Sequence, residues 1–133
     1  MIKVSRLADY AVVILAAFKG SGNAVLSAAA LAEKTRLPEP TVSKVLKLLV
    51  KEGILNSVRG ANGGYVMNND AANISIAKIV KAVDGPISLT ACVEGGEGSC
   101  DYESCCAVKG RWNPVNAALN SALESITLAD MTS

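Results

Sequence analysis

The fold is decided by residues 27–67, which read SAAALAEKTRLPEPTVSKVLKLLVKEGILNSVRGANGGYVM. Ser27 can cap a short helix over 28–34, because its hydroxyl can accept a hydrogen bond from a free amide of the first turn. A three-residue link, 35–37, leads to a second helix that starts near Pro38, whose fixed φ suits a first turn. The spacing therefore predicts two helices joined by a tight turn.

A β-hairpin is expected directly after the second helix. Gly53 can end that helix, and two short extended runs follow over 54–58 and 65–67. The residues between them, 59–64, are too polar and too rich in glycine to belong to a core. A helix pair followed by a glycine-tipped hairpin is the order of a winged helix-turn-helix, in which the second helix enters the major groove of DNA.

The second helix and the hairpin tip carry residue types that suit contact with DNA. Short polar and basic side chains lie off the apolar stripe of the helix, and an arginine opens the tip. Taken singly, such lysines are often only a solvated face and such glycines only a tight turn, but the ordered set favours DNA binding. The candidate DNA contacts are Thr41, Ser43, Lys44 and Lys47 on the helix and Arg59, Gly60, Asn62 and Gly63 on the tip.

Further amphipathic helices flank this unit. Ser5 can cap a first helix, Ser75 can open a fourth helix that Gly85 closes, and Asn113 can cap a last helix with an apolar stripe over 115–126. The stripe could dock on its own domain or on a second copy of the chain. Because a palindromic operator needs two reading helices, we favour a C2 homodimer. The fold class predicted is mainly α, a winged helix-turn-helix with a small β-hairpin wing and a long C-terminal dimerisation helix.

Composition and charge narrow the class of protein. The 133 residues suit one domain, and an apolar fraction of 50% with only 4% aromatic residues suits closely packed helices. Residues 1–81 hold 11 Lys/Arg against 5 Asp/Glu, whereas 82–133 hold 2 against 7. A basic front part is typical of a protein that binds a polyanion. Charges interrupt the apolar pattern of the N-terminus, so we expect neither a signal peptide nor a membrane span, and a cytoplasmic protein.

Catalysis is not expected. The chain has no histidine, which removes Ser-His-Asp and Cys-His chemistry and every zinc site that uses imidazole. No glycine motif for phosphate follows a strand, and no paired carboxylates stand in a recognisable setting. The sequence therefore favours a binding protein over an enzyme.

Four cysteines are confined to one short segment. Cys92, Cys100, Cys105 and Cys106 lie within 15 residues that are rich in Gly, Glu and Ser. Thiolates are ligands of iron–sulfur clusters and of zinc, and they are also redox-active by themselves. The spacing lacks the Cys-x-x-Cys pairs usual in structural zinc sites. From the residues alone, a cluster, a structural zinc and metal-free redox thiols all remain open.

The wing and the cysteines together resemble a known family. Residues 57–65, SVRGANGGY, match a Ser-x-Arg-Gly-x-x-Gly-Gly-Tyr wing signature of the Rrf-two superfamily of winged-helix regulators, in its IscR/NsrR-like branch. The likeness extends through DYA at 9–11, VKAVDG at 80–85, the three spaced cysteines, Trp112 and ITLADM at 126–131. The ending and residues 106–112 most resemble the subgroup that regulates the SUF iron–sulfur assembly operon.

The resemblance implies an iron–sulfur cluster, of 2Fe–2S or 4Fe–4S type, with Cys92, Cys100 and Cys106 as ligands and Cys105 as an extra thiol. One part of the family completes its site with a histidine, which this chain lacks. In another part an aspartate of the first helix of the partner subunit does so, and Asp9 stands at the matching position. The other candidates are Glu94, Glu97, Asp101, Glu103 and Cys105 itself.

The domain organisation expected is a DNA-binding unit over 1–85, a cluster-binding loop over 86–112, and a dimerisation helix with a C-terminal tail over 113–133. The function expected is a cluster-dependent transcriptional regulator, a repressor of iron–sulfur assembly or of iron and redox stress genes, that binds double-stranded DNA as a homodimer. The alternatives are a metal-free thiol sensor and a DNA-binding protein with structural zinc.

Overall fold

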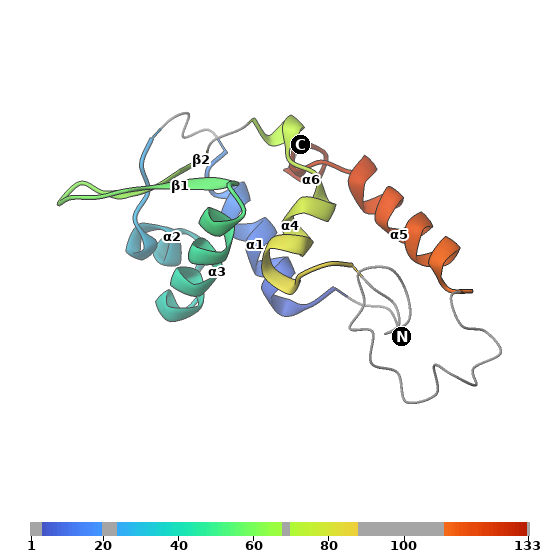
Figure 1. Ribbon diagram of the computed structural model, residues 1–133. Coiled ribbons are helices and arrows are strands. Elements are labelled where there is room, and N and C mark those ends of the chain that lie inside the picture. The colour runs from blue at the N-terminus through green and yellow to red at the C-terminus, as the bar shows by residue number, and fades with distance from the viewer. Residues whose placement is uncertain (1–3, 20–23, 68–69, 88–110, 133) are drawn as a thin grey trace.

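The computed structural model describes residues 4–19, 24–67, 70–87 and 111–132, so all four cysteines lie outside the described residues. A small hairpin and α5 lie at opposite ends of the molecule, with the other helices between them (Figure 1). The elements are α1 (Arg6–Ala16), α2 (Ala28–Thr35), α3 (Glu39–Lys51), β1 (Leu55–Val58), β2 (Gly64–Met67), the 3-10 helix η1 (Ala71–Asn73), α4 (Ile76–Asp84), α5 (Asn113–Ser125) and α6 (Leu128–Thr132).

Side-chain caps begin three of the helices, as their sequences predict. The hydroxyl oxygens of Ser5, Ser27 and Ser75 accept hydrogen bonds from the backbone amides three residues further on, each at 3.1 Å. Gly53 and Gly85 follow the ends of α3 and α4 with positive φ angles of 78° and 82°. The predicted boundaries of α1 to α4 are therefore close to those in the structure.

The core lies where α1, α3 and α4 meet. Most of its side chains are aliphatic, and Phe18 is the one aromatic residue in the buried cluster that the structure describes. Such a composition suits helices that pack closely. The apolar stripe of α3 is fully buried, as expected for the inner face of an amphipathic helix. The largest fully buried side chains are Ile14, Leu15, Leu31, Leu46, Leu49, Ile54, Leu55, Ile74, Ile79, Leu128, Val42 and Val45.

The two strands form an antiparallel hairpin that projects from the helices. Its register pairs Leu55 with Met67 and Val58 with Gly64. Leu26, just before α2, adds an isolated antiparallel bridge to Tyr65 of β2. The hairpin is therefore supported on one edge by the segment that leads into α2.

The C-terminal part departs from the prediction in two ways. Asn113 is not the cap of α5: it is the first residue of the helix, and Trp112 stands at the cap position without a side-chain hydrogen bond. A short helix that the sequence did not predict, α6, follows and packs against α1 and η1. Paired backbone bonds from Ile76 N to Ile126 O and from Leu128 N to Ile74 O, both 2.8 Å, hold the segment between α5 and α6 against the start of α4.

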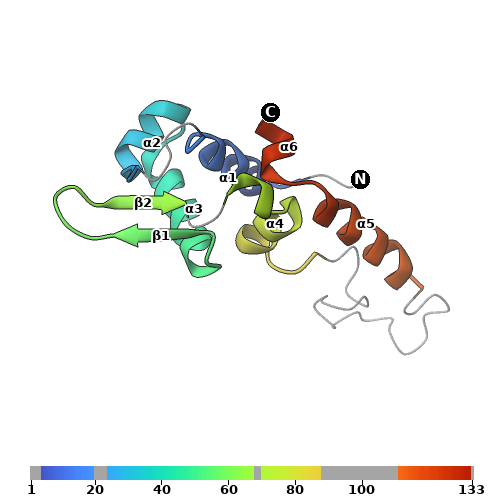
Figure 2. The same cartoon turned by 90° about the horizontal axis from the view of Figure 1, so that it is seen from above.

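The fold class is confirmed: the chain is mainly helical, with a winged helix-turn-helix and a two-stranded wing. Seen from above, the wing again projects away from α5 (Figure 2). Within the described ranges, the helices are too short or too polar to cross a membrane. The division into three functional parts stays a prediction.

Candidate functional site

The outer face of α3 is basic, as the sequence predicts. Lys44 and Lys47 are exposed, and the exposed Lys51 continues the same side into the last turn of the helix. Thr41 and Ser43 are half-buried, so they lie at the edges of this face. The four predicted contact residues of α3 are thus accessible to a ligand, the lysines more so than the two hydroxyls.

The wing tip brings the remaining predicted contacts together. Arg59, Gly60 and Asn62 are exposed, directly after the last residue of β1, and Gly63 is half-buried. The backbone N–H of Gly63 donates to Gly60 O at 2.9 Å, so this amide already takes part in the turn. Arg59 therefore supplies the charge of the tip, while Gly60 and Gly63 shape it.

A close backbone approach fixes the wing relative to the helix pair. Leu26 and Tyr65 exchange two backbone hydrogen bonds, of 2.9 and 2.8 Å. A Cβ atom on Gly64 would lie 2.5 Å from the carbonyl oxygen of Leu26, a distance that real Cβ atoms do not show. Only glycine permits this approach at position 64, and the sequence did not predict that Leu26 braces the wing.

Two basic side chains of the front part serve the fold itself. The Nζ atom of Lys34 donates to Ala17 O at 2.8 Å at the end of α1, and the Nζ atom of Lys19 donates to Thr132 O at the end of α6. Ammonium groups at helix C-termini satisfy carbonyls that lack an intrahelical partner and oppose the negative end of the helix dipole. Fewer basic side chains are therefore available to a ligand than the charge count suggests, and the basic surface centres on α3 and the wing.

The linker between α2 and α3 contains an unusual conformation. Arg36 has φ 62° and ψ 26°, a left-handed conformation that is rare outside glycine. The left-handed residue ends α2 and allows the chain to reverse within the three residues, 36–38, that separate the two helices. The tight turn between the two helices therefore places one non-glycine residue, Arg36, in an unfavourable backbone conformation.

Of the predicted metal ligands, only Asp9 lies in the part of the chain that the structure describes. Cys92, Cys100, Cys105 and Cys106 fall outside the described residues. Asp9 lies in the first turn of α1, its side chain is exposed, and its backbone N–H donates to Ser5 O at 3.1 Å. Among the residues that the structure describes, no group of three or more His, Cys, Asp or Glu side chains could hold a metal ion.

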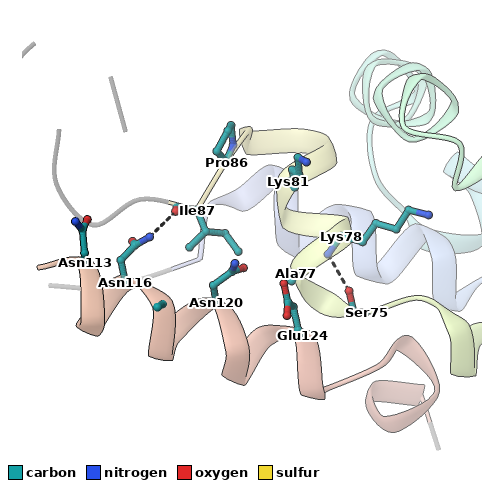
Figure 3. A pocket seen from close by; sticks show the side chains of 11 residues that line it. Ser75, Ala77, Lys78, Lys81, Pro86, Ile87, Asn113, Asn116, Asn120 and Glu124 are labelled. Carbon is teal, nitrogen blue, oxygen red and sulfur yellow. Dashed lines mark hydrogen bonds between the residues drawn. The ribbon is translucent and has the colours of Figure 1, made fainter. Parts of the chain in front are cut away.

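A groove of about 600 Å³ lies between α4 and α5, which also pack against each other (Figure 3). Asn113, Asn116 and Asn120 line it from α5, where they recur at intervals of three and four residues. Lys78 and Lys81 line it from α4. The sequence carries a signal for this second face of α5, because the asparagines recur at helical intervals beside the apolar stripe.

The groove contains the buried polar contact of this region. Asn116 is 8% exposed, and its Nδ2 atom donates to the carbonyl oxygen of Ile87 at 3.0 Å. At the last residue of α4, the Asp84 carboxylate accepts a hydrogen bond of 2.6 Å from the Ser5 hydroxyl. The end of α4 is therefore attached to α1, and the chain that follows it is attached to α5 at Ile87.

Sequence comparison places the chain among transcriptional regulators. The model of the Rrf2 family, described as an iron-dependent transcriptional regulator, matches residues 4–133. The HTH-type transcriptional regulator IscR of Klebsiella pneumoniae (strain 342) is 29% identical over 101 residues. That match covers 76% of this chain and 61% of the relative, so the chain spans less than two thirds of that protein.

Structural comparison agrees. CymR (YrzC), the global cysteine regulator of B. subtilis, has a TM-score of 0.68 at 27% identity, over 99% of this chain and 97% of the other. T. potens IscR has a TM-score of 0.65 at 31% identity, over 98% and 85%. These relatives are transcriptional regulators, which confirms the expectation that the chain is not an enzyme. From its wing, its helix pair and a family match that covers nearly its whole length, the chain belongs to the Rrf2 family of transcriptional regulators.

Proposed function

We propose that the chain binds a palindromic operator as a homodimer, with α3 in the major groove and the wing on the neighbouring backbone or minor groove. The exposure of Lys44, Lys47 and Arg59 on these two elements carries the proposal. Thr41 and Ser43 contact the edges of bases or phosphates, while Gly60, Asn62 and Gly63 bring the tip close to the sugar-phosphate chain. We propose repression as the outcome of binding.

The dimer forms through α5. Val115 and Ile126 are 48% and 41% exposed, and Ala118 and Ala122 between them are exposed as well. These four side chains lie opposite the asparagines that face the groove and are left open by their own subunit, whereas Leu123 of the predicted stripe packs on the core and Leu119 is half-buried. A second copy of the same helix matches such a stripe and places two copies of α3 for two half-sites.

A cysteine-bound iron–sulfur cluster regulates this dimer. Cys92, Cys100 and Cys106 supply three thiolates, and Asp9 of the partner subunit supplies the fourth ligand, with Cys105 as an extra thiol. This donor set fits a cluster, because the thiolates match its soft iron sites and the exposed carboxylate of Asp9 is accessible to a second subunit. When bound, the cluster makes the protein sensitive to iron supply and to oxidants.

The residues transmit this state through the subunit contact. The cluster would have one ligand on α1 of one subunit and three ligands on the other subunit. These bonds join the cysteine segment to the dimer interface, and this connection fixes the separation of the two α3 helices. Loss of the cluster releases that connection and changes operator affinity. Genes of iron–sulfur assembly, or of iron and redox stress, are the targets we propose.

Metal content and absorption test the cluster directly. Protein purified without oxygen should absorb in the visible range and contain iron and acid-labile sulfide. The Cys100→Ala variant should lose both, whereas Cys105→Ala, the matched control one residue from a proposed ligand, should keep both. Zinc in colourless anaerobic protein would contradict the cluster and support the structural-zinc alternative.

A metal-free thiol sensor is the second candidate. It is favoured by the structural similarity, over nearly the full length of both chains, to CymR, a global cysteine regulator. In this case Cys105 and Cys106 would accept oxidants, through disulfides with other thiols or through sulfenic acid. Metal analysis combined with thiol titration under argon separates the candidates: this one requires four titratable thiols, no metal, and oxidation that changes DNA affinity.

A further inference from the structure

One buried polar side chain stands out in the C-terminal half. Asn116 is the only polar residue that is buried among the residues the structure describes. Its neighbours on the same face of α5, Asn113 and Asn120, also line the groove toward α4, but they are more exposed (Figure 3). Because a buried carboxamide costs free energy unless it is hydrogen-bonded, its partner identifies its role.

That partner lies across the cysteine segment. The Nδ2 atom of Asn116 donates to Ile87 O at 3.0 Å, and the backbone N–H of Asn116 donates to Trp112 O at 2.8 Å in the first turn of α5. Ile87 precedes Cys92 by five positions, and Asn116 follows Cys106 by ten. A single side chain therefore joins the chain before the first cysteine to the helix after the last one.

The Ile87 end of this connection lies close to a second hydrogen bond, which joins α4 to α1. Ile87 follows Asp84 by three residues, and the Asp84 carboxylate accepts the hydrogen bond from Ser5 at the start of α1. Asp9, the proposed fourth ligand, is one turn further along α1. Two hydrogen bonds, Ser5 to Asp84 and Asn116 to Ile87, together with the short stretch of chain from Asp84 to Ile87, thus connect the helix with the proposed carboxylate ligand to the helix with the proposed dimer interface.

We propose that Asn116 is a positioning residue that holds the two ends of the cysteine segment together and couples the state of the thiols to the orientation of α5. An aliphatic side chain at this position would leave the Ile87 carbonyl without this donor, although it would pack well on α4. The first part, the joining of the ends, does not depend on the chemistry of the thiols. The second part rests on the proposed function, because it requires that the thiols sense a signal.

An isosteric pair of variants tests the first part. Asn116→Asp keeps the shape of the side chain but replaces the donor with an oxygen that repels the Ile87 carbonyl, whereas Asn120→Asp makes the same change one turn away on the same face. Hydrogen exchange of the peptide around Trp112, in metal-free reduced protein, should be about tenfold faster in Asn116→Asp. The rate at which a maleimide labels the cysteines should change as well. Asn120→Asp should have the exchange rate and the labelling rate of the wild type.

The second part is measured on protein purified without oxygen. If Asn116 couples the segment to α5, Asn116→Asp should shorten the lifetime of the cluster absorption in air and bring the ratio of DNA affinities between loaded and stripped protein toward one. Asn120→Asp should keep both values. If circular dichroism shows that Asn116→Asp is not folded, Asn116→Ser replaces it in every measurement, because serine is smaller and uncharged.

The outcomes separate the two proposals. If the wild-type protein holds no cluster, the proposed cofactor is wrong. Hydrogen exchange around Trp112 and maleimide labelling of the cysteines would still test whether Asn116 holds the ends of the segment together. Wild-type exchange, labelling and affinity ratio in Asn116→Asp, in protein whose cluster is present, would overturn the role of Asn116 and leave the proposed function intact. Equal changes in both Asp variants would reduce the effect to added negative charge and also overturn it.

Discussion

The hydroxyl of Ser5 and the carboxylate of Asp84 form a hydrogen bond of 2.6 Å between residues that lie 79 positions apart. The same Ser5 oxygen accepts the backbone N–H of Ala8 at 3.1 Å, so one atom both caps α1 and attaches it to the end of α4. A cap that acts as acceptor and donor at once joins two helices at a single point, next to the segment that carries the cysteines.

Replacing Ser5 by alanine should reduce the free energy of unfolding more than replacing another cap. Ser27→Ala removes only a cap, which costs about 1 kcal/mol, whereas Ser5→Ala also removes a hydrogen bond to a charged group, for a total of about 2 kcal/mol. Urea unfolding of both variants measures the difference. Equal losses would mean that the Ser5–Asp84 bond contributes nothing to stability.

Arg59→Ala should weaken DNA binding by about 1–3 kcal/mol if Arg59 reads a base or a narrow groove. Arg111→Ala, an exposed arginine beside α5, is the matched control and should leave affinity nearly unchanged. Titrations by fluorescence anisotropy at several salt concentrations measure both, and the wild-type affinity should fall steeply with salt as counterions are released. The same loss in both variants would indicate unspecific attraction rather than a role for the wing.

Gly64→Ala should release the wing from its brace. The added Cβ would lie 2.5 Å from Leu26 O, so the Leu26–Tyr65 bridge must open, at a cost of about 1–3 kcal/mol. Asn56→Ala, an exposed substitution on β1, should cost little. Amide exchange at Tyr65 reports the bridge, and DNA affinity should fall while the helical circular dichroism of the variant stays constant. Retained protection at Tyr65 would contradict the brace.

Ala118→Glu should dissociate the proposed dimer. Ala118 lies at the centre of the exposed stripe of α5, where a carboxylate would be buried by a second copy, at a cost of about 2 kcal/mol or roughly thirtyfold in the dimer dissociation constant. Ser121→Glu adds the same charge to an exposed position off the stripe. Analytical ultracentrifugation over a concentration series compares them. Two variants with the wild-type sedimentation profile would exclude α5 as the interface.

Apart from the 3-10 helix η1, the order and type of the elements from α1 to α4 were predictable because short-range signals determine them. Serine caps, the glycines after α3 and α4, and helical apolar spacing act within a few residues of the chain. The candidate contacts on α3 and the wing were predictable for a related reason. A polar face opposite an apolar stripe must lie outside the core, wherever the helix finally packs.

The long-range contacts could not be read in the same way. The bridge from Leu26 to Tyr65, the bond from Asn116 to Ile87 and the helix α6 depend on which segments meet after folding. The cap of α5 was misassigned because Asn113 is a common cap residue, but the helix starts one residue earlier in the chain, after Trp112. The charge count also misled in part, since Lys19 and Lys34 bind helix ends.

In the function proposed here, the cysteine-bound cluster sets the affinity for DNA. The most direct test is a DNA titration without oxygen. Three samples are compared: the protein as isolated, the same protein stripped of metal, and Cys100→Ala. The DNA duplexes are those that the isolated or the stripped protein enriches from a random library. The proposal predicts that the first two differ by about tenfold or more, which is 1.4 kcal/mol of coupling, and that Cys100→Ala behaves as the stripped protein. Identical affinities for all three, with iron present in the first, would contradict it.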